Sequence, residues 1–133
     1  MKRILFSLVA IMLVSLPASA QTERDDNKVV DTKFATVAGA LVASTIFDME
    51  TSFPAIRNHG GQESNPVMKP FINSGRTATY VLLGGIDAGI IYTSYHLRKS
   101  ERPSIRKLWW VMPVVMTAGH AVAGGLNLRF TIR

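Results

Sequence analysis

The sequence predicts an all-α protein, in which a cleavable signal peptide is followed by a three-helix transmembrane bundle. Three observations predict this class. Of the 133 residues, 47% are hydrophobic, and the mean hydropathy is positive at +0.19. The apolar residues gather in a few long runs, and the chain begins with a basic pair ahead of a short apolar stretch. A chain of this length forms one domain, and its core is expected to be a helix bundle in lipid.

Residues 1–20 have the layout of a secretory signal peptide. Lys2 and Arg3 form the basic start, residues 4–16 form the apolar region, and Pro17 precedes the small-residue triplet at 18–20. This layout predicts cleavage after Ala20, with the mature chain beginning outside the cytoplasm. The alternative is an uncleaved signal anchor that remains as an extra helix.

Two polar segments flank the first apolar run of the mature chain. Residues 21–33 form an exposed polar arm, in which Asp31 or Thr32 is expected to cap the following helix. The loop at 54–76 is rich in Pro, Gly and Asn, and it is longer than a plain connection needs. Such a loop either carries function or folds back as a cover over the end of the bundle.

The helical membrane domain is expected over residues 34–128, with helices at about 34–53, 77–95 and 108–126, ahead of a basic tail at 129–133. The apolar part of the first segment, 34–47, would cover only about 21 Å, so a crossing helix has to continue toward Pro54. Otherwise this segment is re-entrant or interfacial. The other two are long enough to cross, and aromatic residues mark their ends: Tyr92, Tyr95, Trp109 and Trp110.

The net charge of +6 comes from basic residues that flank the apolar runs. This placement favours lipid headgroups over nucleic acid as the partner. The expected headgroup contacts lie in the loop at 96–107: Arg98, Lys99, Arg102, Arg106 and Lys107.

We expect a multi-pass protein of the bacterial inner membrane with its mature N-terminus on the non-cytoplasmic side. Three crossings would then place this basic loop outside, whereas the positive-inside rule places it inside. The two rules agree only if the first segment does not cross.

Three ionisable residues lie at membrane depth, one in each apolar segment: Asp48, Asp87 and His120. Counted at about 1.5 Å per residue, all three fall in one middle band, so a polar cluster is geometrically possible. Tyr80 shares a helical face with Asp87 and could join it. The cluster could share a proton or hold a divalent metal. Alternatively, the charges satisfy one another and only fix the helices.

Small residues four apart predict the faces on which helices pack closely: Gly85 with Gly89, and Ala121 with Gly125. The packing could be within one chain, between copies, or against a membrane protein partner. The chain has no cysteine, so disulfides, thiol catalysis and Cys-ligated metals are excluded. We find no catalytic, phosphate-loop or zinc-protease motif. No cofactor is expected, apart from the metal considered above.

Three short motifs carry a resemblance: the run Asp48-Met49-Glu50-Thr51-Ser52, the run from Gly60 to Pro66, and Trp109-Trp110 followed by His120. On these residues, residues 34–128 resemble a family of small bacterial multi-helix membrane proteins, a domain family of unknown function, with Asp-x-x-Thr, Gly-x-Glu-x-Asn-Pro and Trp-Trp/His motifs. Ser52 stands where the family has a second threonine. The resemblance implies no activity, but it implies one constellation: Asp48, Thr51, Glu63, Asn65 and His120. Alternatively, Asn65-Pro66 is a turn and Glu63 its helix cap.

The leading hypothesis for function is therefore a structural or interaction component of the inner membrane, without enzyme activity. The alternative is an intramembrane site for proton relay or metal-dependent chemistry, built from Asp48, Asp87 and His120.

Overall fold

The computed structural model describes residues 28–58, 62–63 and 66–132, with side chains described as far as Arg129. Its elements are α2 (Thr32–Asn58), α3 (Lys69–Asn73), α4 (Arg76–Lys99), α5 (Pro103–Arg106) and α6 (Val111–Ile132). Every element in this part of the chain is a helix, so the all-α class is confirmed. The predicted signal peptide and most of the predicted polar arm lie outside the described residues.

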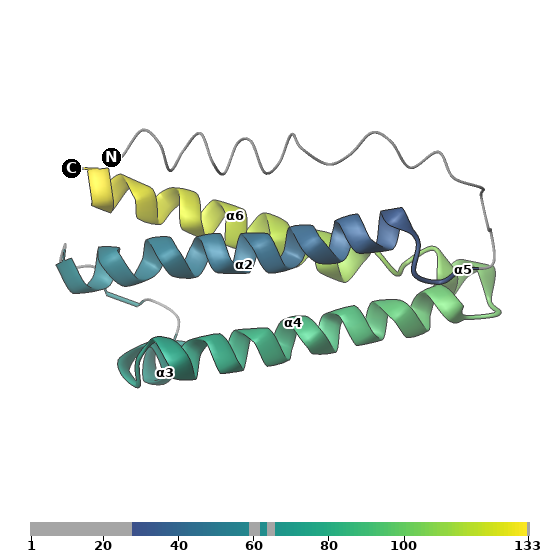
Figure 1. Cartoon of the computed structure of the whole chain (residues 1–133), viewed down its shortest axis with the longest axis horizontal. Coiled ribbons are helices and arrows are strands. Elements are labelled where there is room, and N and C mark those ends of the chain that lie inside the picture. Colours follow the sequence, from purple (N-terminus) through teal and green to yellow (C-terminus); the bar gives the residue numbers. More distant parts are fainter. Residues whose placement is uncertain (1–27, 59–61, 64–65, 133) are drawn as a thin grey trace.

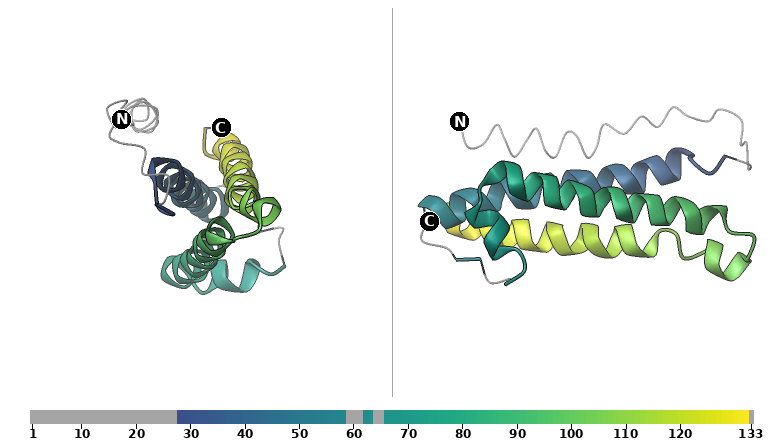
Figure 2. Two further views of the ribbon diagram at one scale, coloured as in Figure 1. Left: turned by 90° about the vertical axis from the view of Figure 1, so that its right-hand side faces the viewer. Right: turned by 90° about the horizontal axis from the view of Figure 1, so that it is seen from below.

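The three long helices lie side by side, with α4 running opposite to α2 and α6 (Figures 1 and 2). Side-chain contacts give the same directions. Asp31, just before α2, binds Arg98 near the end of α4, whereas Glu50 on α2 binds Arg76 at the start of α4. Along α2 and α6 the bonded pairs advance together, because Asp48 meets His120 and Ser52 meets Asn127. The parallel pair α2 and α6 forms the most extensive helix contact.

The first helix is longer than the expected 34–53. It begins at Thr32 because Asp31 caps it: the Phe34 backbone N–H donates to Asp31 Oδ1 at 2.8 Å. It also continues through Pro54 to Asn58. A proline inside a helix loses one backbone hydrogen bond, here the one to the Glu50 carbonyl. Phe53 and Ala55 on either side are buried, and that burial stabilises the extra turn.

The second and third helices also differ from the expected bounds. The second, expected at 77–95, continues to Lys99 before the chain turns at Ser100. The third, expected at 108–126, begins only at Val111, because residues 107–110 form a turn, and it runs on to Ile132. Pro113 therefore lies in the first turn of α6, where its missing N–H would have no helical partner anyway. The predicted basic tail at 129–132 is the last turn of this helix.

The described part of the loop between α2 and α4 folds back against one end of these two helices. There α3 places Ile72 in a buried cluster with Met49, Phe53 and Leu83. The Thr79 hydroxyl donates to the Phe71 carbonyl at 3.0 Å, which ties α3 to α4. Of the two interpretations of this loop, the cover over the bundle end is the one that these contacts support.

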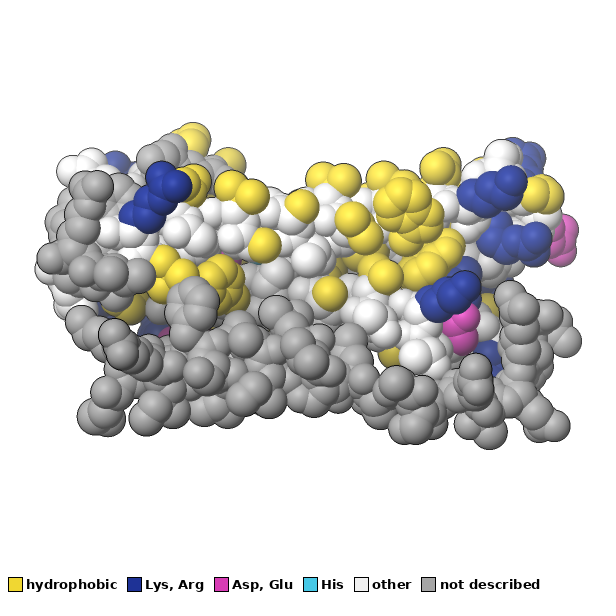
Figure 3. Space-filling model, turned by 90° about the horizontal axis from the view of Figure 1, so that it is seen from above, with side chains coloured by type: hydrophobic (Ala, Val, Ile, Leu, Met, Phe, Trp, Pro, Cys, Tyr) yellow, Lys and Arg dark blue, Asp and Glu magenta, His cyan; other side chains and the backbone are white. Residues whose placement is uncertain are grey.

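Within the described residues, one helical stretch is long and apolar enough to cross a membrane. It runs from Pro103 to Arg129, and only 11% of its apolar window is buried. Small and hydroxyl residues, together with Asp48 and Asp87, make α2 and α4 less apolar than α6. Of the three segments that the sequence predicts to cross, only the last has the length and apolar composition of a membrane span. On the face seen in Figure 3, hydrophobic side chains lie along the middle, and Lys and Arg side chains lie toward the two ends.

Within one chain, the helices do not pack closely at the glycines that the sequence pattern predicted; packing between copies at these positions stays a prediction. A Cβ added at Gly85, Gly89 or Gly125 would meet no atom within 4 Å. The close approach is instead at Gly124 on α6, where an added Cβ would lie 2.5 Å from Phe47 Cε1 and 3.2 Å from the Asp48 Cα. Ala121 is exposed. A pattern of small residues indicates that a helix can pack closely against a neighbour. It does not tell which glycine makes the contact, because successive residues are rotated by about 100° around the helix axis.

Candidate functional site

The centre of the candidate site is a pair of side chains that joins α2 to α6. His120 Nδ1 lies 2.8 Å from Asp48 Oδ2, and these side chains are only 12% and 16% exposed. An ionised carboxylate can only accept, so Nδ1 carries the hydrogen and donates it. The pair therefore fixes both the orientation and the tautomer of the imidazole. In neutral His120 this leaves Nε2 with a free lone pair.

Two further residues hold the Asp48 carboxylate in place. The Ser52 hydroxyl donates to Asp48 Oδ1 at 3.1 Å. Asn127 Nδ2 donates to the Ser52 oxygen at 2.7 Å and to Asp48 Oδ1 at 3.3 Å. Our sequence reasoning missed both residues as members of the site. Helical spacing could have found them, because Ser52 lies one turn after Asp48 and Asn127 lies about two turns after His120.

Asp87 on α4 supplies the third ionisable group of the predicted cluster. It is 4% exposed, and its Oδ1 has no hydrogen-bond partner among the described residues. His120 Nε2 is also buried without a partner there. Within the described residues, no hydrogen bond joins Asp87 to the Asp48–His120 pair. The three helices thus bring an imidazole, one bonded carboxylate and one unbonded carboxylate into the same interior.

The other predicted members of the constellation lie differently. The Thr51 hydroxyl donates to the carbonyls of Phe47 and Asp48, both at 2.9 Å. Both of these bonds lie within α2 and do not reach α6. Asn65 lies outside the described residues. Glu63 belongs to the connection after α2, and the bonds around Asp48 come from other residues. Tyr80 donates to Glu50 Oε1 at 2.6 Å, at the level of Arg76, rather than to Asp87.

No group of three or more His, Cys, Asp or Glu side chains that could hold a metal ion is found in the part of the chain that the structure describes. Asp48 and His120 supply two ligands side by side, and Asp87 is not placed as a third. Structural and catalytic metal sites take three or four protein ligands. The described residues therefore show two adjacent candidate ligands and no complete set of three.

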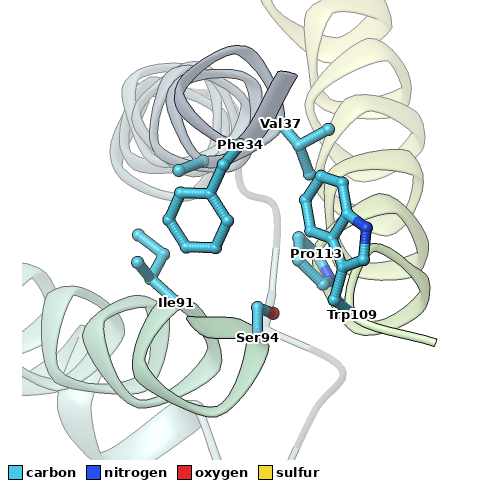
Figure 4. A pocket seen from close by; sticks show the side chains of 7 residues that line it. Phe34, Val37, Ile91, Ser94, Trp109 and Pro113 are labelled. Atoms are coloured by element: carbon cyan, nitrogen blue, oxygen red, sulfur yellow. The ribbon is translucent and has the colours of Figure 1, made fainter. Parts of the chain in front are cut away.

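A second polar contact links the start of α2 to the last turn of α4. Arg98 donates to both oxygens of Asp31, at 2.6 and 2.5 Å, and its guanidinium lies 4.7 Å from the Trp109 ring centroid. These hydrogen bonds lower the pKa of Asp31 to about 2. Figure 4 shows Phe34 of α2 beside Trp109, which lies in the turn just before α6, with Ile91 and Ser94 of α4 next to them.

Arg98 was expected to contact lipid headgroups, but the structure places it in this internal ion pair and over the rings of Phe34 and Trp109. The other members of the predicted headgroup set are exposed at the same end of the molecule: Lys99, Arg102, Arg106 and Lys107. Sequence reasoning missed the pairing because the two partners lie 67 residues apart and meet only through the antiparallel course of α4.

Comparisons with protein-family models, with characterised protein sequences and with solved structures found no match.

Proposed function

We propose that the chain is a small multi-span helical membrane protein whose Asp48–His120 pair binds and passes a proton inside the membrane. One observation carries the proposal. Asp48 holds His120 through Nδ1, while Nε2 of His120 and Oδ1 of Asp87 are both buried without a partner among the described residues. A proton is the smallest species that satisfies a nitrogen lone pair in such an interior.

The membrane location draws support from dimensions and surface chemistry. Helices of 22 to 27 residues are about 33 to 40 Å long, enough to cross a hydrocarbon core of about 30 Å. Large apolar side chains of α6 face outward, with Val115 62% and Val122 64% exposed. A soluble protein rarely leaves such a surface uncovered. The family resemblance, the bacterial inner membrane and the non-cytoplasmic N-terminus of the mature chain belong to the same proposal.

The proposed mechanism uses three groups in sequence. His120 takes a proton on Nε2, and the bonded Asp48 carboxylate stabilises the resulting imidazolium, as a carboxylate does for a general-base histidine. Asp87 then receives the proton from Nε2 after a small approach of α4 to α6, which returns His120 to its neutral form. Because charge at membrane depth is costly, transfer from the imidazolium to the Asp87 carboxylate is favourable in this proposal: it leaves both His120 and Asp87 neutral.

The leading hypothesis from the sequence, a structural or interaction component, remains the second candidate. The observation that favours it is the bonding of Ser52 and Asn127 around Asp48, next to the close approach of Gly124 to Phe47. On that view the polar residues only fix α2 against α6. A divalent metal is a weaker alternative, because the Asp48–His120 pair supplies only two adjacent ligands.

The test is proton uptake in liposomes that enclose a pH-sensitive dye and contain the purified protein. We expect the wild type to admit protons under an imposed pH gradient, and Asp48→Asn and His120→Gln to lose this flux. His96→Gln is the matched control, because His96 is exposed near the end of α4. Wild-type liposomes no more permeable than protein-free liposomes would exclude the relay. Equal flux in the wild type and in His120→Gln would exclude His120 as its carrier.

A further inference from the structure

A groove separates the first turns of α2 and α6 at the end where Arg98 binds Asp31. Its volume is about 410 Å³, within the range of small-molecule sites in proteins. The lining residues come from the start of α2, from the turn before α6 and from α6 itself: Thr32, Lys33, Thr36, Val37, Trp109, Trp110 and Val114. Val37 and Trp109 also border the narrow pocket of Figure 4, so the groove lies directly outside the Phe34–Trp109 contact.

Nearly all of the surface that lines the groove is apolar, and Thr32, Lys33 and Thr36 contribute its few polar side chains. Thr32 and Lys33 lie at the outer end of α2, while Val37 lies more than one turn further in, and Val114 lies one turn inside Trp110 on α6. An occupant that fits this order has a polar head at the end of the molecule and an apolar tail toward its middle. A phospholipid in a bilayer that contains the helices has this orientation. Tryptophan at the groove mouth suits the headgroup level.

The positive charge at the groove favours anionic lipids over neutral ones. Lys33 is the one ionisable residue in the lining. The carboxylate nearest to it in sequence, Asp31, is bound to Arg98, so it does not neutralise the groove from within. Four further exposed cations lie on the same end, on α4 and around α5: Lys99, Arg102, Arg106 and Lys107. Clustered Lys and Arg attract anionic headgroups, and each adds to the attraction when it lies near the membrane surface.

We infer that the groove between α2 and α6 binds one anionic phospholipid, with the phosphate at Lys33 and an acyl chain along Val37 and Val114. The inference rests on the proposed membrane location, but it does not depend on the proton relay. At the headgroup level, the lipid phosphate would bind the Lys33 ammonium group. Below it, the acyl chain would pack on valine and tryptophan side chains.

The chain reports on this groove directly, because its two tryptophans both line it. The full-length protein is placed in phosphatidylcholine bilayers that contain a small fraction of either brominated phosphatidylglycerol or brominated phosphatidylcholine. Bromine quenches tryptophan only at contact range. We expect the anionic lipid to quench at least twofold more than the neutral lipid at equal mole fraction, and inorganic phosphate in the buffer to leave this difference unchanged.

Lys33→Glu and the milder Lys33→Gln should remove the difference between the two lipids, while circular dichroism confirms that both variants fold. Lys69→Glu, at the opposite end on α3, is the matched control and should retain it. Equal quenching by both lipids in the wild type would overturn the groove as an anionic-lipid site and leave the membrane location standing. Absence of quenching by either lipid would overturn both. Loss of the difference in added phosphate would assign the site to free anions.

Discussion

Three carboxylates at the start of α2 and within it bind different partners, according to how deeply each is buried. Asp31 and Glu50 bind arginines of α4, at 35% and 50% exposure of their side chains. Asp48 lies deeper and binds a histidine instead. Burying two permanent charges costs several kcal/mol for each ion. A histidine avoids part of this cost, because it hydrogen-bonds a carboxylate in its neutral form as well.

Asp31 offers a clean test of one ion pair, because Asn can replace it as a helix cap. Asp31→Asn keeps an oxygen for the Phe34 N–H and removes the charge that Arg98 binds. We expect the variant to lose about 1 kcal/mol of stability at pH 7, a value reduced for the exposure of this pair. Unfolding followed by circular dichroism in a mild detergent measures it. Glu101→Gln, at an exposed position just after α4, is the control in which loss of a carboxylate charge should cost little.

The same contact predicts an acid dependence. Folding lowers the pKa of Asp31 from 3.8 to about 2, so the folded state binds this proton less well than the unfolded state. The stabilisation is therefore complete above pH 4 and disappears as the pH falls toward 2. The difference in unfolding midpoint between wild type and Asp31→Asn should shrink over this window. A difference that stays constant down to pH 2 would show that the ion pair does not cause it.

Asp87 separates the two functional hypotheses, because they predict different results for one substitution. Asp87→Leu removes a buried carboxyl group whose Oδ1 has no partner in the described chain. Replacing an uncompensated buried charge by an apolar side chain of similar size is neutral or stabilising, by about 1 kcal/mol or more. We therefore expect an unfolding midpoint equal to or above that of the wild type, together with loss of proton uptake. Unchanged uptake would leave Asp87 without a role in transfer.

At the scale of the helices, the sequence allowed the approximate positions of the three long helices to be predicted, but not the short helices α3 and α5, because only apolar runs of 14 to 19 residues leave few alternatives. The ends were less predictable. Asp31 is a recognisable cap, but nothing in the run itself indicates that α2 passes Pro54, since burial of Phe53 and Ala55 decides this. The packing glycine was missed for a related reason. Gly124 and Gly125 are neighbours in sequence, and only the rotation of α6 separates them.

Gly124→Ala and Gly125→Ala form a matched pair on one helix. Both gain helix propensity, by up to about 1 kcal/mol. Only Gly124→Ala pushes a Cβ into Phe47 and toward the Asp48 backbone, and overpacking of this kind costs about 1 to 3 kcal/mol. We expect Gly124→Ala to lower the unfolding midpoint and Gly125→Ala to leave it equal or higher. If both substitutions destabilise equally, α6 is rotated from the described position.

At the scale of the whole molecule, part of the site was predictable and part was not. Depth counting along three antiparallel spans correctly brought Asp48 and His120 to one level, because rise per residue is the same in every helix. It could not give the rotation of α4, which leaves Asp87 near the pair without a bond to it. The pairs Asp31–Arg98 and Glu50–Arg76 depend on how α2 and α4 meet after the chain reverses between them. No local pattern encodes such contacts.

Orientation is the property on which two sequence rules disagree, and single cysteines can decide it because the chain has none. Ser104 on α5 and Asn73 at the end of α3 are exposed at opposite ends of the long helices. In intact bacterial cells that express Ser104→Cys or Asn73→Cys, a membrane-impermeant maleimide reaches only outward-facing thiols. If three helices cross, one variant is labelled in intact cells and the other only after lysis. The signal-peptide layout predicts that Ser104→Cys is the labelled one, whereas the positive-inside rule predicts Asn73→Cys. Labelling of both variants in intact cells would contradict the three crossings, and with them the burial of the Asp48–His120 pair in lipid.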